Sequence, residues 1–495
     1  MNTVVPHKQQ KRSLPYILLL PALAVCVCLQ LGIAALVPQG FLAALISLFK
    51  APGYASYPYN TSMQVTLFSS PTMLYAGMVP DSFALRTGDG TAVQKVPERL
   101  FAVYKDILYT STFTADLQGG ATLLRALSES DGKLLWSYSF ENLNNVQLVD
   151  GILYLNKAET WQQQGLLQAL DPESGRLLWQ YQCSSQDCYV GSPQALNGTA
   201  YVEVQESAAS ALLALRISDG SPLWRVASYA DSIQPLLTTD RLLMQTSSDT
   251  YTAYSAIDGR LLWQKRLSPA NTGRLRTISN GSVCIIQTST ALYALRLDSG
   301  SLLWQWQGSP TGIKLSDTEV YLAEPAGLLA LNASSGQKMW QQAYPSWAAS
   351  SAKTTSADQG NTILGESNGM IYTLVKGDQN GFAAYALFAF RAVDGQMTWQ
   401  HRFTLATGPG ISMPPGEQSI VAGSDMEALL VGNSVYVISY LAVTTILPVH
   451  FTISLTSALS SFFNTTTFTL TAQSIDAQTG NVRWHTQQVE QFHVA

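Results

Sequence analysis

The sequence contains little charge. Lys and Arg number 28 and Asp and Glu 33 among 495 residues, so charged residues make up 12% of the chain, about half the share of an average soluble domain. Hydrophobic residues stand at an ordinary 46%, which excludes intrinsic disorder because disorder requires low hydrophobicity together with high charge. The net charge of −5 also argues against nucleic-acid binding, which needs a clustered basic surface.

Motifs that carry catalysis or hold metals are also missing. The chain has no GxSxG, HExxH or phosphate-cradling loop. Its five histidines show no metal-ligand spacing: His7, His401, His450, His485 and His493. Many acidic residues are isolated or precede glycine, as at Asp131, Asp219, Asp258 and Asp394, where a role in forming the turn is expected. These features favour a non-catalytic protein without a metal site or cofactor.

Cysteine is scarce, with five residues in the chain. Cys26 and Cys28 lie in an apolar run, and neither follows the small residue that a lipoprotein signal needs. Cys183 and Cys188 could close a small loop as a disulfide in an oxidising compartment. As half of a zinc site the pair is incomplete, because no second pair or nearby His completes four ligands. Cys284, in SVCIIQ, is expected to be a buried thiol.

A membrane segment is predicted near the N-terminus. After Lys8, Lys11 and Arg12, no charged residue appears until Lys50. The apolar run Leu14–Val37 has 24 residues, and about 20 suffice to cross a bilayer as a helix. Because positive residues stay on the cytoplasmic side, the rest of the chain should be translocated. The alternative is a cleaved signal peptide, whose apolar region usually has only about 7 to 15 residues.

The expected organisation follows from this segment. It comprises a cytoplasmic basic tail (1–13), a transmembrane helix acting as signal anchor (14–37), a juxtamembrane linker (38–69) and an exported domain (70–495). The predicted location is the cell membrane, with a single pass and the C-terminal domain on the extracytoplasmic side.

An eleven-residue repeat organises the exported domain. It has Ala or Ser first, Gly seventh and Trp eleventh, and eight of the eleven tryptophans occupy its last position. The copies are Ala126–Trp136, Ala169–Trp179, Ala214–Trp224, Ala253–Trp263, Ala294–Trp304, Ala330–Trp340, Ala389–Trp399 and Ser474–Trp484. Their glycines are Gly132, Gly175, Gly220, Gly259, Gly300, Gly336, Gly395 and Gly480. A degenerate ninth copy, Ala84–Gln94, has Gln in place of Trp.

Each copy predicts part of a small antiparallel sheet. Strand-like runs such as GILYLNK precede the copies, the glycine suits a tight turn with positive φ, and Leu-Leu-Trp begins another strand. The first six tryptophans of the repeat are 36 to 45 residues apart, and a period near 40 is that of a β-propeller blade. Such blades stack around an axis, where the large tryptophan ring is suited to packing between neighbours.

This pattern resembles the tryptophan-docking motif of the pyrroloquinoline-quinone (PQQ) type β-propeller repeat. The resemblance implies an all-β, eight-bladed propeller of four-stranded antiparallel blades, with each docking tryptophan bridging adjacent blades. Asp171 and Asp476 fit the third position of the motif, whereas the other copies depart from it. With nine copies for eight blades, the degenerate copy belongs either to a composite closing blade with C-terminal residues or to an extra cap.

The resemblance implies two classes of function. Quinoprotein dehydrogenases hold PQQ and Ca²⁺ at the propeller axis, and many carry an adjacent Cys-Cys disulfide, which this sequence lacks. Non-catalytic members, such as the lipoprotein propeller of the outer-membrane barrel assembly machinery, serve as platforms for proteins. We therefore expect a membrane-anchored, extracytoplasmic scaffold or sensing module with a protein partner. A PQQ- and Ca²⁺-dependent alcohol or sugar dehydrogenase is the alternative.

The last two copies follow longer spacings, of 59 and 85 residues. They indicate insertions of about 20 and about 45 residues over the forty-residue period. In the larger one, no Asp, Glu, Lys or Arg occurs from Ala428 to Ile475. This predicts either longer strands with a serine-rich turn or a protruding hairpin that docks on a partner or the membrane surface. The smaller insertion includes KGDQNG (376–381), expected to be a polar hairpin loop.

Overall fold

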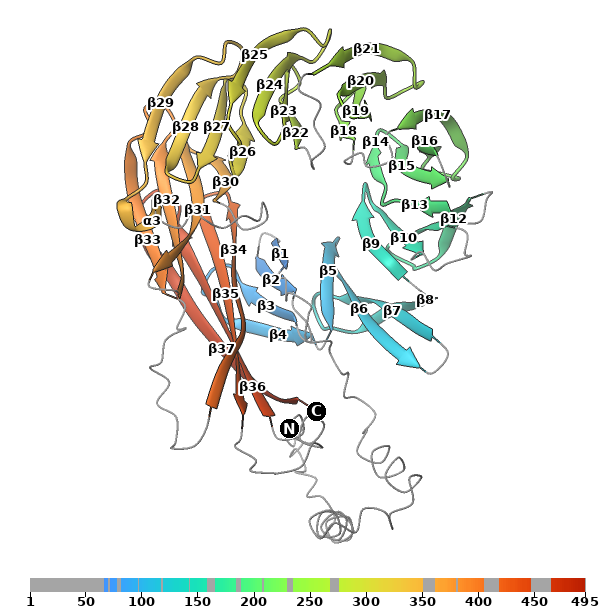
Figure 1. Ribbon diagram of the computed structural model, residues 1–495. Coiled ribbons are helices and arrows are strands. Elements are labelled where there is room, and N and C mark those ends of the chain that lie inside the picture. The colour runs from blue at the N-terminus through green and yellow to red at the C-terminus, as the bar shows by residue number, and fades with distance from the viewer. Residues whose placement is uncertain are drawn as a thin grey trace, which may run out of the picture.

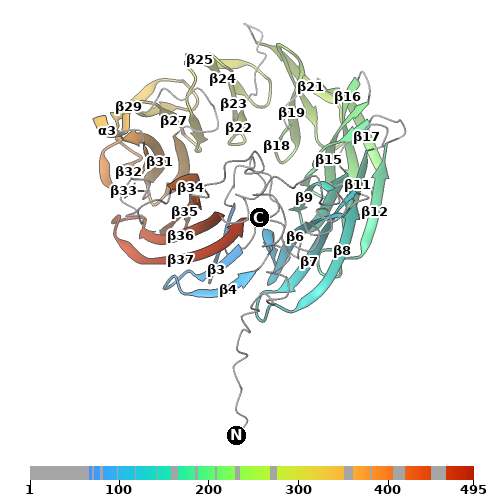
Figure 2. The same cartoon turned by 60° about the horizontal axis from the view of Figure 1, so that its bottom comes forward.

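The repeats fold into small antiparallel sheets arranged in a ring (Figures 1 and 2). The computed structural model describes residues 66–494 except 70–71, 78–81, 97, 117–118, 142, 158–164, 184–187, 207–208, 229–234, 268–275, 350–360, 380–381, 405–417 and 447–463. Within this part of the chain there are nine sheets, and each sheet takes its strands from one continuous stretch of sequence. Each sheet is one propeller blade, and the blades are numbered one to nine along the chain.

The strands of the nine blades have the following bounds. Blade one contains β1 (Thr66–Ser69), β2 (Met73–Gly77), β3 (Ser82–Arg86) and β4 (Ala92–Val96); blade two, β5 (Arg99–Tyr104), β6 (Ile107–Asp116), β7 (Gly119–Ser128) and β8 (Leu134–Glu141); blade three, β9 (Leu143–Val149), β10 (Ile152–Lys157), β11 (Leu166–Leu170) and β12 (Leu177–Gln182). Blade four contains β13 (Cys188–Val190), β14 (Gln194–Leu196), β15 (Thr199–Glu206), β16 (Ala209–Arg216) and β17 (Pro222–Ser228); blade five, β18 (Leu236–Leu237), β19 (Arg241–Ser247), β20 (Thr250–Ser255) and β21 (Leu261–Arg266); blade six, β22 (Thr277–Ser279), β23 (Val283–Gln287), β24 (Ala291–Arg296) and β25 (Leu302–Gln307). Blade seven contains β26 (Gly312–Leu315), β27 (Glu319–Glu324), β28 (Gly327–Asn332) and β29 (Lys338–Ala343); blade eight, β30 (Thr362–Ser367), β31 (Met370–Gln379), β32 (Phe382–Arg391) and β33 (Met397–Thr404); blade nine, β34 (Gln418–Val431), β35 (Ser434–Ile446), β36 (Asn464–Asp476) and β37 (Val482–Val494). A short helix, α3 (Ser346–Ala349), follows blade seven.

The propeller has nine blades, so the prediction of eight was wrong. The degenerate copy Ala84–Gln94 forms the third and fourth strands of a complete blade one. Ala84 lies opposite Gln94 in this sheet, in the register that pairs Ala126 with Trp136 in blade two. The tryptophan bridges two blades and does not form the sheet of its own blade, so the sheet survives the loss of the tryptophan. The degenerate copy is therefore neither part of a composite blade nor an extra cap.

The ring closes between blades nine and one. The indole N–H of Trp484 donates a hydrogen bond to the Thr87 carbonyl, 2.8 Å away and 397 residues apart in sequence. Phe83 and Leu85 of blade one form a buried cluster with Ile438 and Trp484 of blade nine. In Figure 2 the red blade nine accordingly lies beside the blue blade one. Closure is therefore made by side-chain packing between two sheets, each of which is complete in itself.

The strand order gives the ring two distinct faces. In an antiparallel blade, the turns after the first and third strands lie at one end of the strands. This end, here called the turn face, carries the glycines of the repeat. The opposite end, here called the hairpin face, carries the hairpins between second and third strands, the start of β1 and the end of β37 (Figure 1).

The predicted transmembrane helix, Leu14–Val37, lies outside the described residues, as do Cys26 and Cys28. Among the residues that the structure does describe, no helix is both long enough and apolar enough to cross a membrane. The described part of the propeller extends from Thr66 to Val494.

Candidate functional site

Eight tryptophans of the repeat each join their own blade to the following one, at every joint except that between blades one and two. Each indole N–H donates a hydrogen bond of 2.5 to 3.1 Å to a carbonyl in the turn between the third and fourth strands of the following blade. The donor and acceptor residues are Trp136 and Pro172, Trp179 and Ile217, Trp224 and Ile257, Trp263 and Leu297, Trp304 and Ala333, Trp340 and Ala392, Trp399 and Ala477, and Trp484 and Thr87. The same tryptophans thus set the angle and spacing between successive blades.

The glycine of each receiving turn lies directly against the incoming ring. Gly336 has φ of +69°, and a β-carbon built there would lie 2.6 Å from the Trp304 ring. The same contact occurs at Gly90, Gly175, Gly220, Gly259, Gly300, Gly395 and Gly480. Gly132, with φ of +67°, occupies this position in blade two. Glycine is therefore needed both for the left-handed backbone and for the close approach of the indole.

A tyrosine lies on the second strand at the docking row of seven blades, whereas blades five and six have Leu243 and Ile285 there, and sequence reasoning missed it. In blade eight, Tyr372 lies opposite Ala389, which lies opposite Trp399, so the small alanine separates two aromatic rings whose centroids are 6.0 Å apart. The tyrosines in this row are Tyr75, Tyr109, Tyr154, Tyr201, Tyr321, Tyr372 and Tyr436. Burial raises the pKa of Tyr372 to about 12, and its hydroxyl donates to the Ala477 carbonyl that also receives Trp399. The recurring tyrosine in the strand-like runs before the repeat copies, as in GILYLNK, could have revealed this row from the sequence.

The aspartates that precede glycine act in the turns themselves. Asp394 accepts a hydrogen bond from the Gln396 backbone N–H, and Asp131, Asp219 and Asp258 make the equivalent contact two residues along. Hydrogen bonds from Arg391, and then from the Gln396 backbone, hold the pKa of Asp394 below its usual range. These carboxylates thus stabilise the backbone of the turns on the turn face.

The cysteines lie where apolar packing is dense. Cys183 and Cys188 form a disulfide between blades three and four, and both are buried near Trp179 and Val190. Cys284 is a buried free thiol in β23, and burial raises its pKa, so the thiol stays protonated at neutral pH.

The described residues show no cluster of His, Cys, Asp and Glu side chains typical of a metal site. Among them, no group of three or more His, Cys, Asp or Glu side chains gathers closely enough to hold a metal ion. His401 is partly buried, its ring centroid lies 4.8 Å from that of Phe403, and burial lowers its pKa. We therefore assign no step to PQQ or Ca²⁺.

Blade nine carries the longest strands in the described part of the chain and extends beyond the ring (Figure 1). Its four strands have 13 or 14 residues, against six for β28 of blade seven. From Ser474, in the docking row, β36 continues back to Asn464, a distance of about 30 Å at the usual rise per residue. In blade seven the corresponding part of β28 continues only from Ala330, in the docking row, back to Gly327. The strands are thus longer, as the first of the two alternatives predicted, while residues 447–463, between β35 and β36, lie outside the described residues.

The smaller insertion lengthens the hairpin of blade eight. Strands β31 and β32 pair continuously from Met370 opposite Arg391 to Gln379 opposite Phe382. KGDQNG falls at the end of this hairpin, and its last two residues, 380–381, lie outside the described part. Both insertions therefore extend the hairpin face.

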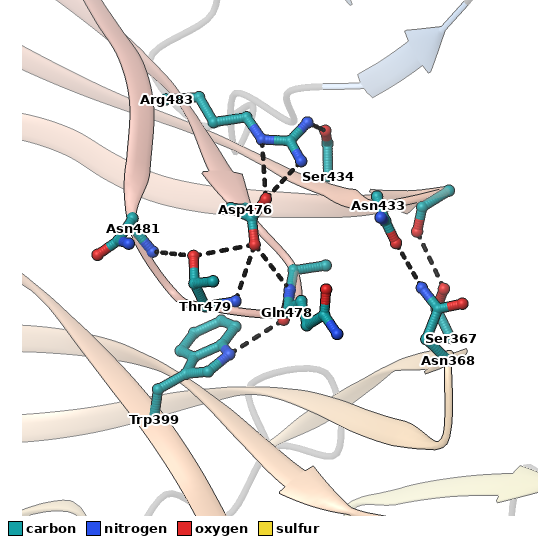
Figure 3. A network of polar contacts seen from close by, with 12 residues as sticks. Ser367, Asn368, Trp399, Asn433, Ser434, Asp476, Gln478, Thr479, Asn481 and Arg483 are labelled. Carbon is teal, nitrogen blue, oxygen red and sulfur yellow. Dashed lines mark hydrogen bonds and ion pairs between the residues drawn. The ribbon is translucent and has the colours of Figure 1, made fainter.

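The turn-face end of blade nine is fastened by polar contacts (Figure 3). Asp476 accepts hydrogen bonds from the backbone of Gln478 and Thr479 and from the Arg483 guanidinium, which also donates to Ser434. A second group links blade eight to blade nine: Asn368 donates to the Asn433 side chain, and Ser367 donates to the Gly432 carbonyl at 3.0 Å. Trp399 adds its own dock at the same joint. The long sheet thus starts from a fixed base.

Asp476 makes this base sensitive to pH. Hydrogen bonds from Arg483, and then from the Thr479 backbone, lower the pKa of Asp476 to about 2. A carboxylate with a depressed folded-state pKa contributes stability above its unfolded-state pKa and loses that stability as pH falls toward the folded value. The window here runs from about pH 4 down to about pH 2.

Replacing Asp476 with asparagine should therefore lower the free energy of unfolding by about 1 kcal/mol at neutral pH, since the ion pair is partly exposed. The asparagine retains an oxygen for the turn, as Asn332 does in blade seven with the backbone of Ser334 and Ser335. Urea denaturation from pH 7 to pH 2 measures the effect, and the difference from wild type should shrink below about pH 4. A difference that stays constant down to pH 2 would contradict the role of the charge.

Comparisons with known proteins found one family model and several similar solved structures. A family model described as outer membrane protein assembly factor BamB matches residues 92–203 and 165–310. No curated protein matches the sequence at a significant level. Among solved structures, BamB from Moraxella catarrhalis is similar at 14% identity and a TM-score of 0.42, with 68% of this chain and 92% of that chain covered. A quinohemoprotein alcohol dehydrogenase from Comamonas testosteroni is similar at 12% identity and a TM-score of 0.42, with 78% of this chain and 72% of that chain covered. A eukaryotic initiation factor is similar at 12% identity and a TM-score of 0.48, with 72% of this chain and 92% of that chain covered. These structural similarities support no inference about activity.

The repeats and their docks define a closed β-propeller of tryptophan-docked blades. The predicted resemblance to the PQQ-like β-propeller repeat is confirmed by the family match, which runs from β4 to the end of blade six.

Proposed function

We propose that this chain is a non-catalytic, extracytoplasmic propeller that binds a protein partner through the extended sheet of blade nine. The observation that carries the proposal is the length of β34–β37, which continue past the ring while the other blades end near it. In the described part of the chain, β34 pairs with β35 alone and β37 with β36 alone, so each outer strand of the extension has a free edge. Long free edges with few charges invite pairing or aggregation unless they are covered.

The composition of the extension supports a proteinaceous cover. The charge-free stretch from Ala428 to Ile475 includes both inner strands, rich in Thr, Val, Ile and Phe. Such residues suit a flat pleated surface that packs on another sheet or strand. The long β-sheet also stands on a base held by Asp476, Trp399 and Trp484. A rigid arm of this kind loses little conformational entropy on binding.

The proposal also gives the propeller an orientation. The apolar segment 14–37 would hold the chain at the membrane, followed by 28 residues before β1. That linker spans at most about 95 Å when fully extended. Because β1 begins on the hairpin face, the linker would enter the propeller on the same side as the blade-nine extension.

Shortening the extension tests the proposal. Leu441 of β35 and Thr469 of β36 lie directly opposite each other, so replacing residues 442–468 with Asn-Gly closes the hairpin without changing its register. We expect the full-length variant to keep its thermal midpoint and to lose protein crosslinks that wild type forms in membranes, because the far ends of β34 and β37 lose the inner strands that hold their free edges in the sheet.

The matched control shortens the hairpin of blade eight on the same face. Lys376 lies opposite Tyr385, so replacing residues 377–384 with Asn-Gly leaves blade eight in register. This control should keep the crosslinks. Unchanged crosslinking after the blade-nine change would overturn the proposal, and so would an extension that binds lipid vesicles with no protein crosslink.

The quinoprotein dehydrogenase is the alternative function. Adding PQQ and Ca²⁺ to purified protein and measuring chromophore binding and dye reduction distinguishes the two, since a scaffold shows neither.

A further inference from the structure

The joint between blades one and two is built differently from the other eight. On the fourth strand of blade one, Gln94 lies opposite Ala84. The equivalent position in blade nine is held by Trp484, which lies opposite Ser474. Blade one therefore brings no indole to the turn at Gly132. That turn nevertheless has the same backbone as the others, with positive φ and a hydrogen bond from the Gly132 N–H to the Ser128 carbonyl.

The receiving turn of blade two also differs. Glu129 lies three residues before Gly132, and its carboxylate accepts a hydrogen bond from the Tyr75 hydroxyl of blade one. The residues at the same position in the other blades carry no charge: Thr87, Pro172, Ile217, Ala256, Leu297, Ala333, Ala392 and Ala477. A charged contact therefore replaces the apolar dock at the turn-face end of this joint.

A second polar group holds the hairpin-face end. Glu98, in the connection between the two blades, is 8% exposed, and its carboxylate contacts Arg125 and the Thr110 hydroxyl, both of blade two. Ser82 of blade one donates to the Glu98 carbonyl and accepts from the Leu100 N–H, both at 2.8 Å. Between the two polar ends lies an apolar core that includes Tyr75, Leu100 and Leu108.

The two kinds of joint differ in what opening costs. Water can replace a hydrogen bond when a joint opens, so such a bond contributes about 0.5–1.5 kcal/mol net, and a buried ion pair is weak evidence for stability. Truncating a buried tryptophan to alanine costs about 3–5 kcal/mol, so a joint that buries a tryptophan is costlier to open. On its other side, Phe83 of blade one packs with Leu470 and Trp484 of blade nine. Blade one is therefore bound more firmly to blade nine than to blade two, its neighbour in sequence.

We propose that the ring opens at the joint between blades one and two, with blade one remaining docked on blade nine. Opening separates Tyr75 from Glu129 and uncovers the turn at Gly132, while the eight tryptophan docks stay closed.

Hydrogen–deuterium exchange of the full chain tests this proposal, because three turns offer equivalent amides. The N–H groups of Gly90, Gly132 and Gly336 each bond a carbonyl four residues back, at 2.8 or 2.9 Å. Peptides covering Gly132 should exchange at least about tenfold faster than those covering Gly90 and Gly336, because local opening exposes that turn alone. Equal exchange at all three turns in wild type overturns the proposal.

Two variants check the cause. Gln94→Trp supplies the missing indole, and exchange at Gly132 should slow to the rate of the other two turns. Glu129→Ala removes the Tyr75 contact and places at this position the residue found in blades seven to nine, so exchange at Gly132 alone should rise. A folded Gln94→Trp protein whose Gly132 turn still exchanges at the wild-type rate, or a Glu129→Ala protein that exchanges faster at all three turns, contradicts the proposal.

Discussion

Replacing Trp304 with alanine is expected to lower the free energy of unfolding by about 3–5 kcal/mol. Trp304 is 8% exposed, its N–H donates to the Ala333 carbonyl at 2.8 Å, and its ring covers Gly336. The change leaves a cavity between blades six and seven and leaves a buried carbonyl without its donor. Neighbouring docks cannot compensate, because each tryptophan serves one joint.

Trp306, on the same strand, provides a matched control. It is partly buried, and its ring lies against Gly308 just after the strand rather than against a glycine of blade seven. Trp306→Ala should cost about 1–2 kcal/mol, because less apolar surface becomes exposed. Urea denaturation followed by circular dichroism compares the two variants. Equal losses would show that docking between blades adds nothing beyond the burial of a tryptophan.

The sequence predicted the blade and its joints more reliably than the number of blades. The eleven-residue repeat contains both halves of a dock, the glycine that receives and the tryptophan that inserts. These halves belong to different joints, so counting tryptophans counts docked joints. Blade one carries Gly90 but has Gln94 at the tryptophan position, and it therefore forms a ninth blade with one undocked side.

Contacts between sequence-distant strands could not be predicted from the repeat. Tyr372 and Trp399 lie in the same row of three neighbouring strands, and their rings come close because the residue between them is the small Ala389. The number of residues between those strands varies from blade to blade, so the repeat does not reveal this row. The pairing of Glu98 with Arg125 likewise depends on how the connection before β5 folds back onto β7. The lengthened strands of blade nine were predictable, since a charge-free, Thr-rich run can satisfy its backbone by continuing an existing sheet.

The closing dock is the other point at which a single change should have a large effect. Gly90 has φ of +71°, and a β-carbon there would lie 2.3 Å from the Trp484 ring. Valine cannot easily adopt this backbone, at a cost of about 1–3 kcal/mol, and it would also displace Trp484 from its dock. We therefore expect Gly90→Val to cost at least about 3 kcal/mol.

The loss should be confined to blade one. Its joint with blade two is polar, so once Trp484 is displaced neither side holds blade one through a tryptophan dock. The joints from blade two to blade nine keep their seven tryptophan docks. Limited proteolysis of Gly90→Val should therefore cut within residues 66–96 and leave the rest resistant.

Gly88→Val, in the same turn, is the control. A β-carbon at Gly88 would meet nothing within 4 Å, so the change should alter stability by no more than about 0.5 kcal/mol. If Gly90→Val kept the stability and protease resistance of Gly88→Val, closure would depend on the apolar contacts of Phe83 and Leu470 rather than on the Trp484 dock. If instead every blade became sensitive at once, the nine blades would unfold as one unit, and blade one could not move independently of blade two.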